Sequence, residues 1–320
     1  MVVERRSGHI SHLLFRDLPD ILQPGDLLVL NETRVLPARL HARRQATGGL
    51  IEILLMGENP DNRRWQALLR PVRKVKPGDR LVLSGEEGWL EVCEKGEYGL
   101  CLLQPCFAKK MEALMAEHGE TPLPPYIKRG KPAWEEEDRE RYQTIYARVP
   151  GSIAAPTAGF HFTPEVLDRL AQRQIETSFL TLHVGPATFQ PVRVENIEHH
   201  LLPAEKVHIS RETAQQIQKA RNDKRRVIAV GTTSARALES SAAGHAGIVK
   251  AGEAWADLYI HPPYSFQVIG GLITNFHLPR SSLLILVASF AGRELILDCY
   301  KRAIGEKYRF YSYGDGMVIL

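Results

Sequence analysis

The chain has 320 residues, of which 44% are hydrophobic and 24% are charged, a composition typical of a globular protein with one large domain or two unequal ones. Its start is charged and lacks the apolar segment of a signal peptide, and its longest apolar stretch, residues 283–291, is too short to span a bilayer. We therefore expect a cytoplasmic protein with no membrane partner. The formal net charge of +4 allows an anionic partner without requiring one.

The first part of the chain has the texture of β structure. Residues 24–30 combine a Pro-Gly-Asp turn with a short apolar strand, and residues 77–83 repeat this device. Short alternating runs then favour a small antiparallel barrel with predicted strands at residues 51–56, 65–69, 80–83, 89–93 and 99–103. A charged helix over residues 109–118 and an extended, proline-rich segment follow.

After residue 142 predicted strands alternate with helices. Thr163 and Pro164 form a helix start, with Thr as the N-cap and Pro at the first helical position. Strands are predicted at residues 177–184, 226–230 and 268–275, and helices at residues 211–222, from 234 and over 282–306. This alternation argues for a largely parallel sheet covered by helices. We predict a discontinuous α/β domain of residues 1–45 and 144–320, with residues 46–143 as an inserted β-barrel domain.

Polar loops follow several of these strands. In parallel α/β folds ligands bind at the carboxyl ends of the strands, so the loops at residues 156–162, 183–188, 231–234 and 274–279 should converge on one rim. His161, His183 and His277 lie in these loops, and His is the natural proton carrier near neutral pH. A single His at a strand end is more often structural, and the turn at residues 231–234 alone is more often a simple helix start.

Basic residues concentrate between positions 63 and 80 and again near residue 128. A solvated face is the simpler interpretation of such clusters, and a surface that binds nucleic-acid phosphates is the functional one. The candidate phosphate-binding residues are Arg70, Arg73, Lys74, Lys76, Lys128 and Arg129.

The sequence lacks several motifs that would indicate other chemistry. The four cysteines contain no C-x-x-C pair, so we predict no metal site. No dinucleotide fingerprint, P-loop or G-x-S-x-G elbow occurs. The residues alone predict an α/β enzyme with a polar, histidine-containing rim, and they leave its reaction open.

Eight motifs, in order along the chain, resemble the S-adenosylmethionine:tRNA ribosyltransferase-isomerases of queuosine synthesis. They include Asn-Glu-Thr-Arg-Val-Leu-Pro-Ala-Arg at residues 31–39, Ala-Pro-Thr-Ala-Gly-Phe-His-Phe at residues 155–162 and Thr-Leu-His-Val-Gly at residues 181–185. The others are Pro-Pro-Tyr-Ile-Lys at 124–128, Arg-Tyr-Gln-Thr-Ile-Tyr-Ala at 141–147, Val-Gly-Thr-Thr-Ser-Ala-Arg at 230–236, Ile-Thr-Asn-Phe-His-Leu-Pro at 273–279 and Tyr-Ser-Tyr-Gly-Asp at 311–315. Relatives usually carry a further N-terminal segment before the position of Val2, and Glu32 stands where they mostly have Asp.

The resemblance implies a large, partial-barrel-like α/β domain that carries an inserted small antiparallel β-barrel. It also implies that the ribosyl part of S-adenosylmethionine is moved onto 7-aminomethyl-7-deazaguanine at the wobble position of a tRNA with a queuosine-type anticodon, giving epoxyqueuosine, adenine and methionine. S-adenosylmethionine would be a consumed substrate, with no further cofactor, and we expect a monomer.

The resemblance and the chemistry together suggest roles for the rim residues. We expect His161, His183 or His277 to supply a proton transfer. Asp315 would receive the sulfonium or the substrate amine, with a plain turn residue as an equal alternative. The candidates for a carboxylate or phosphate are Gly231, Thr232, Thr233 and Arg236, and those for nucleobase edges are Asn31, Thr33, Arg34 and Arg39. The other predicted substrate-binding residues are Pro156, Thr157, Gly159, Phe162, Gly185, Thr274, Asn275 and Phe276.

Three competing functions differ in their chemistry. A base-exchanging tRNA-guanine transglycosylase needs a zinc site that these cysteines cannot supply. A tRNA methyltransferase would also use S-adenosylmethionine, but no glycine-rich fingerprint supports it. A truncated paralogue that binds tRNA without activity is the alternative that is not an enzyme.

Overall fold

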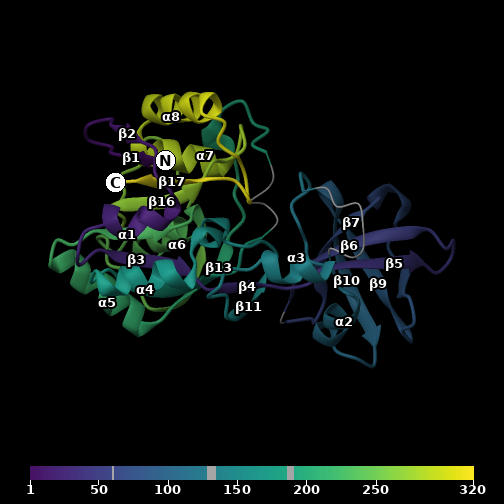
Figure 1. Cartoon of the computed structure of the whole chain (residues 1–320). Helices are drawn as coiled ribbons and strands as arrows, with labels where there is room; N and C mark the ends of the chain where they lie inside the picture. Colours follow the sequence, from purple (N-terminus) through teal and green to yellow (C-terminus); the bar gives the residue numbers. More distant parts are fainter. Residues whose placement is uncertain (60, 128–134, 186–190) are drawn as a thin grey trace. The chain divides into compact units, whose positions relative to one another are not determined.

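The computed structural model describes residues 1–59, 61–127, 135–185 and 191–320 (Figure 1). The chain divides into two compact units, each with its own apolar core. The larger unit contains Met1–Arg34, Gln143–Val149 and Ala155–Leu320, and the smaller one contains Val35–Tyr142 and Pro150–Ala154. None of the helices in the described ranges has the length and apolar character needed to cross a bilayer.

The larger unit is built on a nine-stranded mixed sheet with the strand order β15-β13-β12-β3-β14-β16-β17-β1-β2. The strands are β1 (Val2–Val3), β2 (Ile10–Ser11), β3 (Leu27–Asn31), β12 (Glu176–Leu182), β13 (Glu205–Ile209), β14 (Val227–Val230), β15 (Gly252–Ala256), β16 (Gly271–Asn275) and β17 (Gly316–Ile319). All residues of β3, β14 and β16 are buried, as expected for central strands covered on both faces.

The predicted α/β class is confirmed, but the prediction of a largely parallel sheet is correct only for the four central strands and for the short pair of β1 with β17. Strands β12, β3, β14 and β16 are parallel, whereas β13, β15 and β17 pair antiparallel with β12, β13 and β16. The reason is visible between β12 and β13. A parallel connection needs a crossover helix, and the described part of this connection has only a short 3-10 turn, η7 (Ile197–His199).

Helices form where amphipathic patterns and caps coincide. Thr163 accepts a 3.3 Å hydrogen bond from the backbone N–H of Val166, which confirms the predicted N-cap of α4. Helix α5 buries Thr213, Ile217 and Ala220 at helical spacing. The helices of this unit are α1 (Leu18–Ile21), α4 (Pro164–Gln172), α5 (Arg211–Asn222), α6 (Thr232–Ala242), α7 (Ser282–Ala291) and α8 (Arg293–Gly305), with 3-10 turns η1 (Phe15–Asp17) and η5 (Thr157–His161).

The single long helix predicted over residues 282–306 is wrong. The chain forms two helices, α7 and α8, that meet at Gly292. Gly292 has a φ of 92°, which lies in the left-handed region and cannot continue a right-handed helix. Apolar periodicity on both sides of a single Gly conceals such a break.

The smaller unit contains a closed antiparallel barrel with the strand order β10-β7-β6-β5-β8-β9. Its strands are β5 (Arg39–Arg44), β6 (Leu50–Glu58), β7 (Trp65–Arg70), β8 (Arg80–Leu83), β9 (Gly88–Lys95) and β10 (Leu100–Phe107). The barrel thus takes in β5, ahead of the predicted boundary at residue 46. The unit also has helices α2 (Met111–His118) and α3 (Glu135–Arg141) and 3-10 turns η2 (Val72–Lys74) and η3 (Glu97–Gly99), and strands β4 (Thr33–Val35) and β11 (Val149–Ser152) pair where the chain passes between the units.

Candidate active site

One edge of the large sheet gathers the loops singled out in the sequence. Strands β3, β12, β14 and β16 are parallel, so their carboxyl ends lie at the same edge. The loop before α4 joins this edge because Thr157 Oγ1 donates a 3.1 Å hydrogen bond to Asn275 Oδ1. The described parts of the predicted loops therefore lie at one edge of the sheet, while residues 186–188 of the second loop fall outside the described residues.

His161 lies at the end of η5 and is held by neighbours on two elements. Its ring stacks on Phe15 with 5.0 Å between ring centroids, and its Nε2 accepts a 3.3 Å hydrogen bond from the amide of Asn275. Thr157 orients that amide, so the neutral imidazole carries its proton on Nδ1. Burial lowers the pKa of His161 to about 4, although the nearby carboxylate of Asp315 acts to raise it. His161 is therefore neutral at pH 7.

A cavity of about 630 Å³ opens beside His161, with Asp315, Tyr308 and Phe15 among its lining residues. Its size lies within the range of sites for small ligands and cofactors. Asp315 accepts hydrogen bonds from the Arg309 side chain at 2.9 Å and from the Arg309 backbone N–H at 2.7 Å. Although burial acts to raise the pKa of Asp315, these Arg309 contacts lower it overall, so a carboxylate faces the cavity at neutral pH.

His277 follows β16, and hydrogen bonds hold both its ring and its backbone. Its Nε2 lies 2.7 Å from Thr274 Oγ1, and its backbone N–H donates a 2.6 Å hydrogen bond to the Tyr300 hydroxyl. Burial lowers the pKa of His277 to about 4. The ring is therefore neutral and fixed in orientation.

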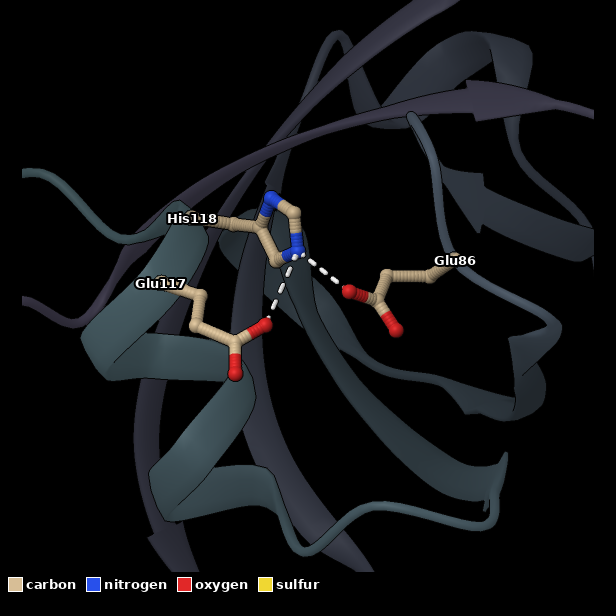
Figure 2. A group of neighbouring side chains, drawn as sticks. All are labelled: Glu86, Glu117 and His118. Atoms are coloured by element: carbon tan, nitrogen blue, oxygen red, sulfur yellow. Dashed lines mark hydrogen bonds and ion pairs between the residues drawn. The ribbon is translucent and has the colours of Figure 1, made fainter.

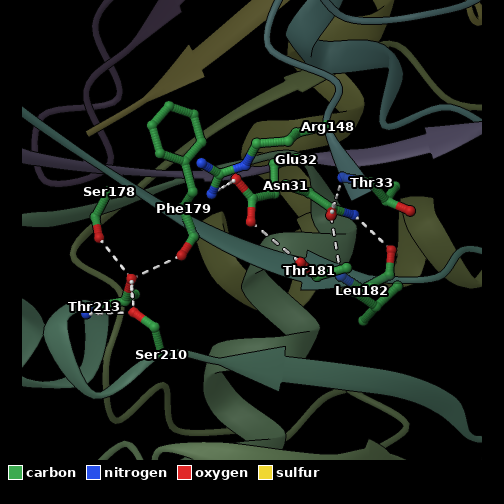
Figure 3. A network of polar contacts seen from close by, with 10 residues as sticks. All are labelled: Asn31, Glu32, Thr33, Arg148, Ser178, Phe179, Thr181, Leu182, Ser210 and Thr213. Carbon is green, nitrogen blue, oxygen red and sulfur yellow. Dashed lines mark hydrogen bonds and ion pairs between the residues drawn. The ribbon is translucent and has the colours of Figure 1, made fainter. Parts of the chain in front are cut away.

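Asn31, at the end of β3, forms hydrogen bonds with Leu182 and Thr33 (Figure 3), and Thr33 leads to the third histidine, His183. The amide of Asn31 donates to the carbonyl of Leu182 at 2.9 Å, while its oxygen accepts from the backbone N–H groups of Leu182 and Thr33. Thr33 Oγ1 in turn lies 3.0 Å from His183 Nδ1. Asn31 is fully buried and its amide forms hydrogen bonds with backbone groups of this chain. Asn31 therefore positions Thr33 and, through it, His183. Burial of the ring and, as a smaller effect, the positive charge of Lys206 lower the pKa of His183.

Figure 3 also shows how the neighbouring strand ends are fixed. Glu32 accepts a 3.3 Å hydrogen bond from Thr181 and forms a 2.7 Å ion pair with Arg148. Glu32 is buried while the Arg148 side chain is 74% exposed, so Arg148 balances the charge of the buried carboxylate from the surface. The Thr213 hydroxyl of α5 accepts a hydrogen bond from Ser178 and donates one to the Phe179 carbonyl, both on β12, which ties the start of α5 to this strand.

Arg236, near the start of α6, differs from the prediction because its guanidinium is already paired with a carboxylate of the chain. Gly231 has a φ of 92°, which a residue with a Cβ adopts only under strain. The next residues, Thr232 and Thr233, line a pocket of about 20 Å³ together with Arg236. Arg236 forms a 2.5 Å ion pair with Glu205. The guanidinium is therefore already neutralised, and the predicted binding of a substrate carboxylate by Arg236 is opposed by a buried carboxylate beside it.

Glu205 is a rim residue that the sequence reasoning missed. Its second oxygen accepts a 2.7 Å hydrogen bond from the backbone N–H of Gly185, so it joins the loop after β12 to the helix after β14. Burial raises the pKa of Glu205, against the opposing effects of Arg236 and the Gly185 N–H. The sequence did contain a signal for the burial of Glu205, because this residue alternates with Val207 and Ile209 at an inward-facing position of β13.

Four further predicted residues prove to be packing residues. Phe162 and Phe276 are 1% and 0% exposed, so neither ring offers a face for stacking on a purine. Gly159 is required by close packing, since a Cβ there would lie 2.2 Å from the Tyr146 hydroxyl. Pro156 is buried directly ahead of η5. Their contribution to the rim is to fix the backbone that carries Thr157 and His161.

The remaining predicted residues lie outside this group. Arg39 belongs to the barrel unit, where it donates a 2.9 Å hydrogen bond to the carbonyl of Leu123, and Arg34 is exposed. The basic residues predicted to bind tRNA lie on β7, in η2 and just after it, and their side chains are exposed: Arg70, Arg73, Lys74 and Lys76. Lys128 and Arg129 fall outside the described residues, as do residues 186–188 of the loop after His183.

A separate polar cluster lies in the barrel unit, where Glu86, Glu117 and His118 approach one another closely enough to hold a metal ion (Figure 2). Lys109 contacts both carboxylates, at 2.8 Å from Glu86 and 2.7 Å from Glu117. Hydrogen bonds from Lys109 and then His118 lower the pKa of Glu86. An ammonium group thus already fills the position between the carboxylates, and the cluster joins α2 to the turn after β8.

Comparison with known proteins extends these findings over the whole chain. The family model described as "Queuosine biosynthesis protein" matches residues 1–319. A protein of Thermus thermophilus is 51% identical over 328 aligned residues, and one of Heliobacterium modesticaldum is 48% identical over 320; both alignments span 100% of this chain and 92% of the relative. Both are named S-adenosylmethionine:tRNA ribosyltransferase-isomerase.

The fold agrees with a solved structure as well. A crystal structure of S-adenosylmethionine tRNA ribosyltransferase from Thermotoga maritima matches with a TM-score of 0.53 and 34% identity, over 100% of this chain and 91% of the other. The alternatives weighed from the sequence, a methyltransferase and a tRNA-binding paralogue without activity, find no support in these names. The chain belongs to the queuosine biosynthesis protein family.

Proposed function

We propose that this chain is an S-adenosylmethionine:tRNA ribosyltransferase-isomerase. The observation that carries the proposal is full-length membership of the family together with a rim on which His161, held by Asn275, lines one cavity with Asp315. The reaction moves the ribosyl part of S-adenosylmethionine onto 7-aminomethyl-7-deazaguanine at the wobble position of a tRNA. Epoxyqueuosine, adenine and methionine are its products.

The chemistry requires a base and benefits from an acid. The sulfonium acidifies the protons on the adjoining 5′ carbon and makes methionine a neutral leaving group, while a proton donated to adenine helps that base to leave. A neutral histidine serves the first task, since its unprotonated ring nitrogen can accept a proton. His161 is our candidate, because its neutral imidazole lines the cavity; its Nε2 would exchange the hydrogen bond from Asn275 for the substrate proton.

Asp315 complements the charge of the substrate. S-adenosylmethionine carries a positive sulfonium, and Asp315 is one of the acidic residues that line the cavity, with Asp17 and Glu306. Arg309 shares the Asp315 carboxylate and would orient it while lowering its net attraction for a cation. His183, supported by Thr33 and Asn31, is the second candidate proton carrier on the rim.

The negatively charged phosphates of the tRNA backbone need positively charged side chains as partners. We assign phosphate contacts to the exposed basic residues of the barrel unit, Arg70, Arg73, Lys74 and Lys76, and extend this assignment to Lys128 and Arg129. S-adenosylmethionine is consumed as a substrate, and the scheme needs no additional cofactor. A monomer in the cytoplasm, where tRNA is available, fits this role.

Free adenine is the measurement that tests the proposal. The purified chain is incubated with S-adenosylmethionine and either tRNA bearing 7-aminomethyl-7-deazaguanine or the same tRNA with an unmodified guanine. Adenine release that requires the modified base supports the proposal. S-adenosylhomocysteine in its place would indicate methyl transfer, and binding of tRNA without either product would contradict an enzymatic role.

The same assay tests His161. We expect His161→Ala to lower kcat by about 10²–10⁴-fold, the usual contribution of one general acid or base. His245→Ala, which changes an exposed histidine elsewhere in the same unit, is the matched control and should retain activity. A loss of less than a few-fold in a folded His161→Ala variant would remove His161 from the mechanism.

A further inference from the structure

The outer strands of the large sheet form a row of side chains that continues from His183. In the antiparallel register Lys206 lies opposite Trp255, and the backbone N–H of His183 bonds to the carbonyl of Lys206. Residues directly opposite in an antiparallel pair point to the same face of the sheet. His183, Lys206 and Trp255 therefore lie side by side on one face, across β12, β13 and β15.

Trp255 is unusual for its size and position. Its side chain is 65% exposed, although Trp is normally among the most buried side chains on average. It lies on β15, the terminal strand of the sheet order. A broad aromatic face is thus presented to solvent in the same row as a candidate catalytic histidine.

We propose that Trp255 is a stacking platform for an unpaired nucleobase of the tRNA, with Lys206 beside it to contact the adjoining phosphate. This proposal rests on the proposed function, which brings a tRNA anticodon loop to the rim. Bases of such loops are unstacked and available, and proteins recognise them by stacking on aromatic side chains next to basic ones. Another base of the anticodon loop would lie on Trp255 while the modified guanine reaches the rim beyond His183.

Glu253 limits the affinity of this surface. Its carboxylate forms a 3.0 Å ion pair with Lys206 on the same face, and both side chains are about half or more exposed, at 66% and 48%. A phosphate that contacts Lys206 must compete with this carboxylate and is repelled by it. Glu253→Gln should therefore tighten RNA binding and make it more sensitive to salt.

The experiment measures binding of a fluorescently labelled anticodon stem-loop RNA by anisotropy, for the wild type and for Trp255→Ala, Trp255→Phe and Ile304→Ala. One base–aromatic stack is worth ~1–3 kcal/mol, which corresponds to a roughly 5- to 150-fold rise in Kd for Trp255→Ala. Trp255→Phe retains a ring and should lose less. Ile304→Ala removes another exposed apolar side chain, 67% exposed on α8, and should bind as the wild type does.

Two further readouts separate stacking from other effects. Stacking on a base quenches tryptophan fluorescence, so RNA should quench the wild type more than Trp255→Phe. In turnover assays Trp255→Ala should raise KM for tRNA and leave kcat nearly unchanged, since Trp255 does not touch the reacting atoms in this proposal.

Unchanged Kd and unchanged quenching in the Trp255 variants would overturn the proposal. So would a dimer, seen by sedimentation, that Trp255→Ala dissolves while RNA binding is retained, because this edge would then be an interface between copies of the chain. The RNA titration needs no catalysis. A wild type that releases no adenine with modified tRNA would therefore count against the proposed function, and the titration would still decide the role of Trp255.

Discussion

A buried carboxylate on α6 gives the sharpest test of how the rim is held together. Glu239 is 0% exposed and accepts four hydrogen bonds from a single segment that leads into β16. The donors are the Tyr264 hydroxyl and the backbone N–H groups of Gln267, Val268 and Ile269, at 2.9–3.1 Å. Helix α6 starts at the rim and β16 ends there, so Glu239 fixes two rim elements to each other.

Replacing Glu239 with Gln keeps its shape and removes half of its accepting capacity. The NH₂ group of the Gln side chain would then face two of the four donors. The Tyr264 hydroxyl can rotate and accept a hydrogen bond from it, whereas a backbone N–H cannot. An unpaired buried N–H costs ~1–3 kcal/mol, and the two remaining bonds change from charged to neutral, at about 1 kcal/mol each. We expect a loss of about 3–5 kcal/mol, or a fall in Tm of roughly 6–20 °C.

Differential scanning calorimetry with two comparison variants tests this expectation. Tyr264→Phe removes one donor and leaves the carboxylate paired with the backbone, so its loss should be about 1 kcal/mol. Glu195→Gln changes an exposed glutamate and should shift stability by less than about 0.5 kcal/mol. If Glu239→Gln were no more destabilising than Glu195→Gln, Glu239 would not anchor the segment and the reasoning would fail.

Three other predictions follow from the site. Asn275→Asp should replace the amide that donates to His161 with a carboxylate that accepts, which raises the pKa of His161 from about 4; titration of the ring followed by NMR would contradict this if the pKa stayed near 4. The pKa of His277 is about 4 in the folded chain against 6.5 unfolded, so its contribution is complete above pH 6.5 and is lost as the pH falls to 4, by up to ~3 kcal/mol. Urea midpoints at pH 7 and pH 5 should show this loss, and His277→Phe should reduce the difference. The double change Arg73→Ala and Lys74→Ala should lower the slope of log Kd for tRNA against log salt by up to about 2, whereas an unchanged slope would show that these side chains meet no phosphate.

Helices and strands could be predicted from local sequence signals. Features that depend on contacts between residues far apart in the sequence could not. The N-cap at Thr163 depends on the residue types next to it, so the sequence contains all the information that the helix start requires. The break at Gly292 has no comparable local signal, because the same Gly could lie within a continuous helix at a modest cost. The antiparallel return of β17 depends on which strand it meets, and that partner, β16, lies far away in the sequence.

The same distinction applies to the site. Histidines in polar loops were found because their type and position after a strand carry meaning without knowledge of their partners. Glu205 and Glu239 were missed, since a single Glu within a strand or helix usually faces solvent. Only the folded chain shows that Glu205 faces Arg236 and that Glu239 faces a row of backbone N–H groups. Arg236 itself was assigned to a ligand because its pairing with Glu205 depends on how β13 and α6 meet in the folded chain.

The division into two units with separate apolar cores has a consequence for how such an enzyme can diverge. Substitutions on the outside of the barrel leave the core of the large sheet untouched, and a damaging change at the rim need not weaken the barrel. The exposed basic side chains of the barrel and the residues of the rim can therefore change through different sets of mutations, each limited by the stability of its own core.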